Sequence, residues 1–153
     1  MSGILFGSRR QQLKVSGAVL VATPQQVALA DVVRAKSMFD KVNIPIVGLI
    51  ENMSYFVCDG CGKKHEIFSR GGAQRAAERF KIPYLGEIPI TPSLREGGDA
   101  GVPSLIQDPR SEVSKCFFEM IQDLCTLIKF GLSSRRDSKC FRFLLTMYFL
   151  SIV

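Results

Sequence analysis

One apolar run, residues 46–50, constrains the fold of this chain more than any other feature. It reads Ile-Val-Gly-Leu-Ile, and a strand covered by helices on both faces is continuously apolar rather than alternating. The run ends at the polar pair Glu51 and Asn52, and a turn containing Cys58 and Cys61 follows. Ligands of open α/β sheets bind beyond the carboxyl ends of the strands. The sequence therefore predicts a buried parallel strand with a candidate site at its end.

Strand and helix signals alternate along the rest of the chain. Residues 17–22 are apolar and predict a first strand. A helix follows, for which Thr23 fits the N-cap and Pro24 fits the first helical position. The later predicted elements are a central strand over 44–50, a short exposed hairpin over 63–68, a helix after Gly71 and Gly72, a strand over 82–89, a loop over 91–110 with a helical turn near 93–96, and a last helix from Asp108 to Gly131.

This alternation through short loops predicts an α/β fold with three layers, a parallel sheet and right-handed crossovers. Three strands are few for such a sheet, so we expect the N-terminal half of the domain to be missing. We assign residues 15–131 to the folded domain, residues 1–14 to an irregular or replaced beginning, and residues 132–153 to a basic and then apolar tail outside the fold. The apolar part of the tail is shorter than the roughly 20 residues that span a bilayer, and no membrane contact is expected.

The net charge of +6 lies at the two ends of the chain. Segments 1–14 and 129–153 carry +3 and +4, which leaves −1 for residues 15–128. A nucleic-acid-binding domain carries its basic patch on the folded body, so no nucleic-acid partner is expected. Five cysteines without a secretory signal do not predict a disulfide framework. They favour a reducing compartment, the cytoplasm, or a mitochondrion or plastid if a longer precursor exists.

The pair Cys58 and Cys61 has three interpretations. A redox dithiol of the thioredoxin kind needs a helix that starts at the pair, and the residues that follow do not predict one. A zinc site could add His65, but a closed site needs four ligands and the chain has no second Cys-x-x-Cys. A metal shared by two chains would receive two thiolates from each, the Cys₄ set of an iron–sulfur cluster. Cys116 and Cys125 adjoin apolar residues of the last predicted helix and are interpreted as packing residues.

Several further motifs accompany the cysteine pair. In chain order they are Thr23-Pro24-Gln25, Val42-Asn43-Ile44-Pro45-Ile46-Val47-Gly48, Glu51-Asn52-Met53-Ser54-Tyr55-Phe56, Cys58-x-x-Cys61, Ile67-Phe68, Gly71-Gly72-Ala73 and Leu85-Gly86-Glu87-Ile88-Pro89. Together they closely resemble the C-terminal half of the Mrp/ApbC (Nubp-like) iron–sulfur carriers, which are related to the MinD/ParA P-loop ATPases. The resemblance runs in order from residue 15 to residue 124.

The resemblance implies a partial P-loop NTPase-like fold and a function in cluster handling. Cys58 and Cys61 would bind half of a [4Fe–4S] cluster that bridges a homodimer. The chain would then be a carrier or scaffold that transfers the cluster to apo iron–sulfur proteins. The alternatives are a small zinc-binding structural or interaction protein and a non-functional fragment.

The resemblance also implies a nucleotide site. Asn52 matches the family's adenine-contacting asparagine, and Ile88, Pro89 and Ile90 match its nucleotide-base loop. An Asn amide can both donate to and accept from a purine edge, and a proline would keep the loop rigid. The local alternative for Asn52 is a turn-forming residue at a strand end.

The chain departs from the family pattern in the motifs that bind the phosphates of the nucleotide. It contains neither a G-x-x-x-x-G-K-[ST] motif nor an Asp-x-Pro-Pro-Gly switch, so these residues provide no phosphate cradle and no catalytic lysine. Asp59-Gly60 stands where many members have a proline between the cysteines. ATP with Mg²⁺ is the cofactor that the family implies, but no catalytic residue is assigned, and we do not expect this chain alone to hydrolyse ATP.

Overall fold

The computed structural model describes residues 17–131 and 149–152. Their main sheet is parallel, with the strand order β5-β2-β1-β6, and a two-stranded antiparallel sheet pairs β3 with β4. The strands are β1 (Ala18–Ala22), β2 (Ile46–Glu51), β3 (Phe56–Val57), β4 (Lys64–His65), β5 (Tyr84–Glu87) and β6 (Phe149–Ile152). The helices are α2 (Gln26–Lys41), α3 (Gly72–Phe80), α4 (Pro92–Ala100), α5 (Ser104–Gln107) and α6 (Glu112–Gly131).

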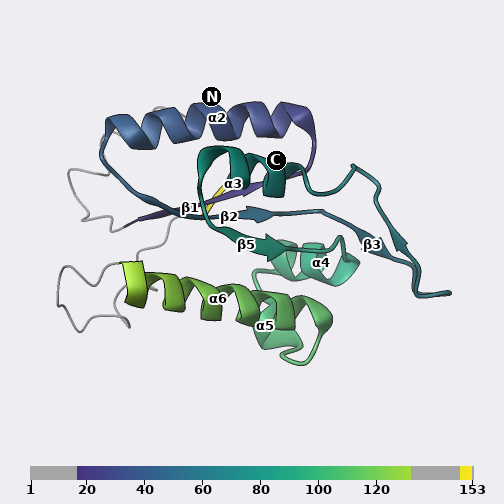
Figure 1. Cartoon of the computed structure of the whole chain (residues 1–153). Coiled ribbons are helices and arrows are strands. Elements are labelled where there is room, and N and C mark those ends of the chain that lie inside the picture. The colour runs from purple at the N-terminus through teal and green to yellow at the C-terminus, as the bar shows by residue number, and fades with distance from the viewer. Residues whose placement is uncertain (1–16, 132–148, 153) are drawn as a thin grey trace.

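These elements form three layers, as the sequence predicted. Helices α2 and α3 cover one face of the main sheet, and α6 with α4 and α5 lies on the other (Figure 1). The α/β class and the parallel sheet are confirmed. The carboxyl ends of β1, β2 and β5 consequently meet at one edge of the sheet, where β2 leads into the cysteine turn.

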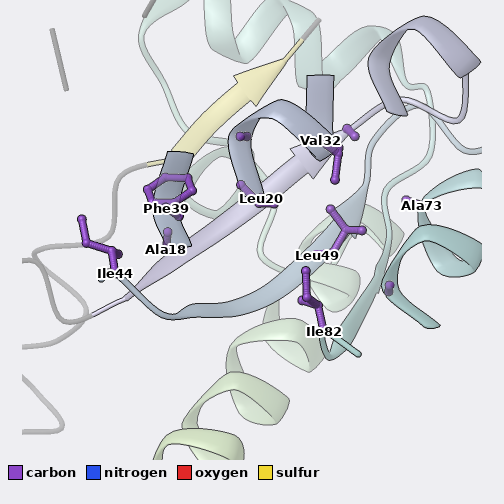
Figure 2. Close-up of a cluster of buried hydrophobic side chains, with 11 residues drawn as sticks. Ala18, Leu20, Val32, Phe39, Ile44, Leu49, Ala73 and Ile82 are labelled. Carbon is purple, nitrogen blue, oxygen red and sulfur yellow. The ribbon is translucent and has the colours of Figure 1, made fainter. Parts of the chain in front are cut away.

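The two faces of β1 supply two separate apolar cores. Leu20 and its neighbours at alternate positions pack with α2 and α3, whereas Val19 and Val21 pack with α6. Figure 2 shows the first core, in which Phe39 and Val32 of α2 lie over the sheet. The residues of β1 are buried on both faces of the sheet. This explains why the sequence of β1 does not alternate between apolar and polar residues.

The glycine inside the opening apolar run has a packing reason. A Cβ atom on Gly48 would lie 2.3 Å from Leu85 Cδ1 of the neighbouring strand β5. The Leu85 side chain therefore fills the space that a side chain at position 48 would need. Only glycine lets β2 and β5 pair here without displacing Leu85.

The C-terminal strand β6 corrects one prediction. Residues 132–153 were expected to lie outside the fold, but Phe149–Ile152 pair in parallel with β1, with Val19 opposite Phe149 and Ala22 opposite Ile152. The physical reason is that β1 is apolar on both faces and behaves as an interior strand. Its second edge carries backbone donors and acceptors that need partners. Residues 1–14 lie outside the described residues.

Several element boundaries also differ from the predicted ones. Helix α2 begins at Gln26, not at Pro24, and no side chain caps it; Thr23 and Pro24 are still buried where the chain leaves β1. The predicted loop over 91–110 contains two helices, α4 and α5. Helix α6 begins at Glu112, where the Ser111 hydroxyl accepts from the Ser114 backbone N–H at 3.2 Å, so Ser111 provides the cap.

Candidate functional site

The cysteine pair lies at the tip of a short hairpin, which we define as residues 56–65 and call the cysteine hairpin. Its strands β3 and β4 pair through Phe56 with His65. Beyond them, the Cys58 N–H donates to the Lys63 carbonyl at 3.0 Å, and the Gly62 N–H donates to the Cys58 carbonyl at 2.7 Å. Gly62 has φ +67°, a conformation that favours glycine. The hairpin predicted over 63–68 therefore differs from the observed one, which pairs residues 56–57 with 64–65 and encloses the cysteines in its turn.

The turn favours the thiolate form of Cys58. Backbone N–H groups of Cys61 and Gly60 hydrogen-bond to its sulfur, and these bonds lower the pKa of the Cys58 thiol against the opposing effects of partial burial and the Asp59 charge. Cys61 is exposed and Cys58 half-buried, and both are free thiols. A thiolate is the form that binds metal, so the turn presents a metal-binding pair to solvent.

The described residues do not complete a metal site around this pair. In residues 17–131 and 149–152 there is no group of three or more His, Cys, Asp or Glu side chains placed to hold one metal ion. The sequence alternative in which His65 joins the two cysteines is therefore not supported by the geometry of one chain. Cys116 lies against the α6 core, where burial is the main cause of its raised pKa. This agrees with its interpretation as a packing residue.

Polar contacts attach the base of the cysteine hairpin to the sheet. The Tyr55 ring is 4% exposed, with Lys64 Nζ 4.2 Å and Arg70 Cζ 5.6 Å from its centroid. Arg70 in turn donates from Nε to Glu87 Oε2 at 3.0 Å and from Nη2 to Glu87 Oε1. This cation–π and bidentate arrangement links the hairpin to β5. We call these four residues the Tyr55 clamp.

The pKa of Glu87 reflects the clamp. Burial alone raises the pKa of this carboxyl, but hydrogen bonds from Arg70 and Ser54, together with the Arg70 charge, outweigh it and lower the pKa. The ionised carboxylate is therefore the form that the folded chain stabilises. The clamp could not be predicted from the sequence, because its members are spread over 33 positions and share no local motif.

Glu51 is a second residue near the site whose role could not be predicted from the sequence. It was read as the polar end of β2, but its side chain is fully buried. Its carboxylate accepts from the Gly71 N–H at 2.9 Å, the Ala73 N–H at 2.7 Å and the Ser54 hydroxyl at 2.7 Å. Free N–H groups at a helix start bind anions. Glu51 thus satisfies the start of α3 and fixes that helix to the end of β2.

The predicted nucleotide-base residues do come together. The Asn52 N–H donates to the Ala22 carbonyl at 2.8 Å, and the Ile88 N–H donates to the Glu51 carbonyl at 2.8 Å. The Ile90 N–H donates to the Tyr55 carbonyl at 2.7 Å. The segment 88–90, which follows β5, therefore runs beside the segment that contains Asn52.

The exposure of these residues is uneven. Asn52 and Ile90 are half-buried, whereas Ile88 and Pro89 are buried in the chain itself. The Asn52 Oδ1 atom accepts from the Met53 N–H at 3.0 Å, and Met53 has a positive φ of 58°. The turn-forming role that the sequence offered as an alternative for Asn52 is thus present.

The described residues do not fit the phosphates of a nucleotide. Helix α3 is the element that starts directly after the site, and its first N–H groups are already used by the Glu51 carboxylate. The sequence contains no phosphate-binding loop motif, and Lys63 and Lys64 are exposed charges on the hairpin. The described residues around Asn52 therefore provide no cradle for a triphosphate with Mg²⁺.

Comparison with known proteins gives consistent relatives. The chain is 50% identical over 128 residues to the "Iron-sulfur protein required for NADH dehydrogenase, mitochondrial" of Arabidopsis thaliana, covering 84% of this chain and 40% of that protein. It is 44% identical over 114 residues to the "Iron-sulfur cluster transfer protein NUBPL" of Dictyostelium discoideum, covering 74% and 35%. The chain thus spans 40% or less of the length of these two relatives.

Solved structures agree with the fold. A nucleotide-binding protein of Archaeoglobus fulgidus in complex with ADP matches with a TM-score of 0.53 and 34% identity, over 63% of this chain and 39% of that one. The cell division ATPase MinD of Pyrococcus furiosus matches with a TM-score of 0.58 and 25% identity, over 73% and 43%. No helix in the described part of the chain is long and apolar enough to cross a membrane.

The family description "ParA: NUBPL iron-transfer P-loop NTPase" matches residues 8–125, which is most of the chain. The resemblance to the iron–sulfur carriers, drawn from the motifs around Cys58 and Cys61, is thereby confirmed. The chain belongs to the NUBPL iron-transfer P-loop NTPase family.

Proposed function

We propose that this chain carries an iron–sulfur cluster as cargo on Cys58 and Cys61 and transfers it to apo-proteins. The observation that carries this proposal is the turn of the cysteine hairpin, where backbone N–H groups lower the pKa of Cys58 and Cys61 stands exposed beside it. Cluster iron is held by thiolates. Membership of an iron-transfer family supports the same chemistry.

The cluster is shared by two copies of the chain. A [4Fe–4S] cluster takes four thiolates, and the hairpin supplies two. Within the described residues no third ligand stands near the pair, and Cys116 is occupied with packing. A second copy brings its own hairpin, and the two pairs complete the Cys₄ set.

Transfer from this site is a ligand exchange without oxidation or reduction. Thiolates of the recipient apo-protein replace Cys58 and Cys61 on the iron atoms, and the two cysteines leave as thiolates or take up protons. Exposure of the hairpin tip gives the incoming ligands access. The compartment is a reducing one, because the free pair has to stay unoxidised: the cytoplasm, or the mitochondrion or plastid for a chain made from a longer precursor.

Nucleotide contact by this chain is limited to the base. Asn52 and Ile90 follow the parallel strands β2 and β5 at the same edge of the sheet and provide the adenine side of a site. The phosphate side has no residues here, so no step of the transfer is assigned to ATP.

Anaerobic reconstitution with iron and sulfide tests the proposal. The loaded chain should show the broad iron–sulfur absorbance at about 400 nm. Cys58→Ser or Cys61→Ser should abolish it, whereas Cys116→Ser, a matched thiol outside the hairpin, should leave it unchanged. A colourless protein that carries stoichiometric zinc after the same treatment would show that the pair is a structural zinc site instead.

A further inference from the structure

A groove of about 670 Å³ runs between α2 and α3, on the face of the sheet opposite α6. It is lined by residues of both helices and by the segment that follows the cysteine hairpin. The groove contains neither of the hairpin cysteines nor Asn52, so the proposed cluster and base sites leave it unused.

The floor of the groove is apolar and has helical spacing. Leu29 and Val33 are four residues apart on α2, and Ala76 and Phe80 are four residues apart on α3. Residues at this spacing lie one above the other on a helix surface. The two helices therefore present two apolar rows with a groove between them. A third helix can lay an apolar stripe along such a groove.

The charges at the groove have one sign. Its charged lining residues are Arg75 and Arg79, both exposed and four residues apart on α3. Neither takes part in a described ion pair: Arg75 donates to the Arg70 carbonyl at 3.4 Å, and Arg79 lies over the Phe80 ring. Asp31, beside the groove residue Ala30, is already paired with Arg34 at 2.6 Å. The groove thus offers two cations that have no carboxylate partner among the described residues.

The chain's own terminal sequences do not match this charge. Residues 1–16 carry three basic residues and no acid, and residues 132–148 carry four basic residues and Asp137. Both stretches are net positive, so placing either beside Arg75 and Arg79 would be repulsive. The occupant that complements Arg75 and Arg79 therefore carries negative charge, which neither of these stretches supplies.

We infer that the groove between α2 and α3 is a docking site for an amphipathic acidic helix of a partner protein. The apolar stripe of that helix packs against Leu29, Val33 and Phe80. Carboxylates beside the stripe, four residues apart, pair with Arg75 and Arg79. The site is independent of the cluster, because none of its residues belongs to the cysteine hairpin.

The probe for this site is a labelled peptide of about 15 residues, the length at which an isolated helix begins to form. It carries a stripe of Leu and Phe with two glutamates four residues apart beside it, and its control peptide has glutamines there. Fluorescence anisotropy with the full chain at low salt should give saturable binding to the acidic peptide. The glutamine peptide should bind about tenfold more weakly.

Variants of the chain locate the binding. Arg75→Gln combined with Arg79→Gln should weaken binding of the acidic peptide about tenfold. Val33→Ser, at a position 42% exposed, should also weaken this binding, because apolar contact is lost. Arg95→Gln combined with Arg110→Gln removes the same charge from exposed positions outside the groove and should have little effect. Circular dichroism of each variant checks that the fold is retained.

Four results would overturn the inference. The first is no saturable binding up to about millimolar peptide, and the second is equal binding to both pairs of arginine variants. The third is binding of the chain to vesicles with anionic lipid that is stronger than to neutral vesicles and depends on Arg75 and Arg79, which would assign the surface to a membrane. The fourth is self-association that the same variants abolish, which would assign the groove to a second copy of the chain.

Discussion

In the sheet, each residue of β1 is at most 5% exposed between two apolar cores, whereas every residue from 59 to 70 around the cysteine hairpin is exposed. Apolar burial on two faces holds β1, and it is largely insensitive to which polar groups surround it. The cysteine hairpin has little to bury and is attached by the Tyr55 clamp and by backbone hydrogen bonds to residues 88–90. The comparison teaches that the site can loosen while the fold persists, because different interactions stabilise the two regions.

The largest expected effect is in the sheet. Leu49→Ala removes a fully buried side chain from the first core, which should lower the free energy of unfolding by about 2–5 kcal/mol. Urea unfolding followed by circular dichroism measures this. Val27→Ala, at a position 77% exposed on α2, is the control and should change little. If Leu49→Ala lowers the free energy of unfolding only slightly, the sheet core is not what stabilises the chain.

Glu51 connects the two regions, and its substitution should have the second-largest effect on stability. Glu51→Ala leaves the Gly71 and Ala73 N–H groups without their acceptor in a buried place, which should cost about 1–3 kcal/mol. Glu51→Gln keeps one acceptor oxygen and should lose less. Hydrogen exchange should speed up first in α3. If the alanine and glutamine variants are equally stable, the carboxylate does not fix α3 as described.

The Tyr55 clamp should show a smaller and local effect. Tyr55→Leu keeps an apolar group but removes the ring that faces Lys64 and Arg70, with a change in global stability of about 1 kcal/mol or less. The cysteine hairpin should become more accessible, which limited proteolysis between residues 58 and 65 would detect. Tyr55→Phe keeps the ring and should behave like the parent chain. Equal cleavage of all three proteins would show that the clamp does not hold the hairpin.

The smallest effect expected is that of pH on the link between Arg70 and Glu87. Because the folded chain lowers the pKa of Glu87, this link contributes its full stability above the carboxyl's unfolded pKa of about 4.3. The contribution is lost as pH falls from there through the lower folded value. The stability difference between the parent chain and Glu87→Gln should therefore be constant near neutral pH and shrink below about pH 4. A difference that grows on acidification would contradict the assigned sign.

The same contrast explains how much could be predicted from the sequence. The continuous apolar runs of β1 and β2, alternating with helix signals, indicated a parallel sheet between helices, because burial leaves a local pattern. The Glu51 cap and the contact between Arg70 and Glu87 left none, since their partners are 17 to 22 positions away. The strand at Phe149–Ile152 was read as a tail because its partner, β1, lies at the other end of the chain. Polar pairs between distant positions leave no periodic pattern in the sequence. The interactions that hold the site in place could therefore be found only in the structure.

The most direct test of the central claim combines loading with sedimentation. Apo and anaerobically reconstituted chains are compared by analytical ultracentrifugation while iron and sulfide are counted. We predict that loading converts monomer to dimer with about four irons for each two chains, and that Cys61→Ser prevents both loading and dimerisation. A loaded chain that remains monomeric with a complete cluster would contradict the shared site on Cys58 and Cys61.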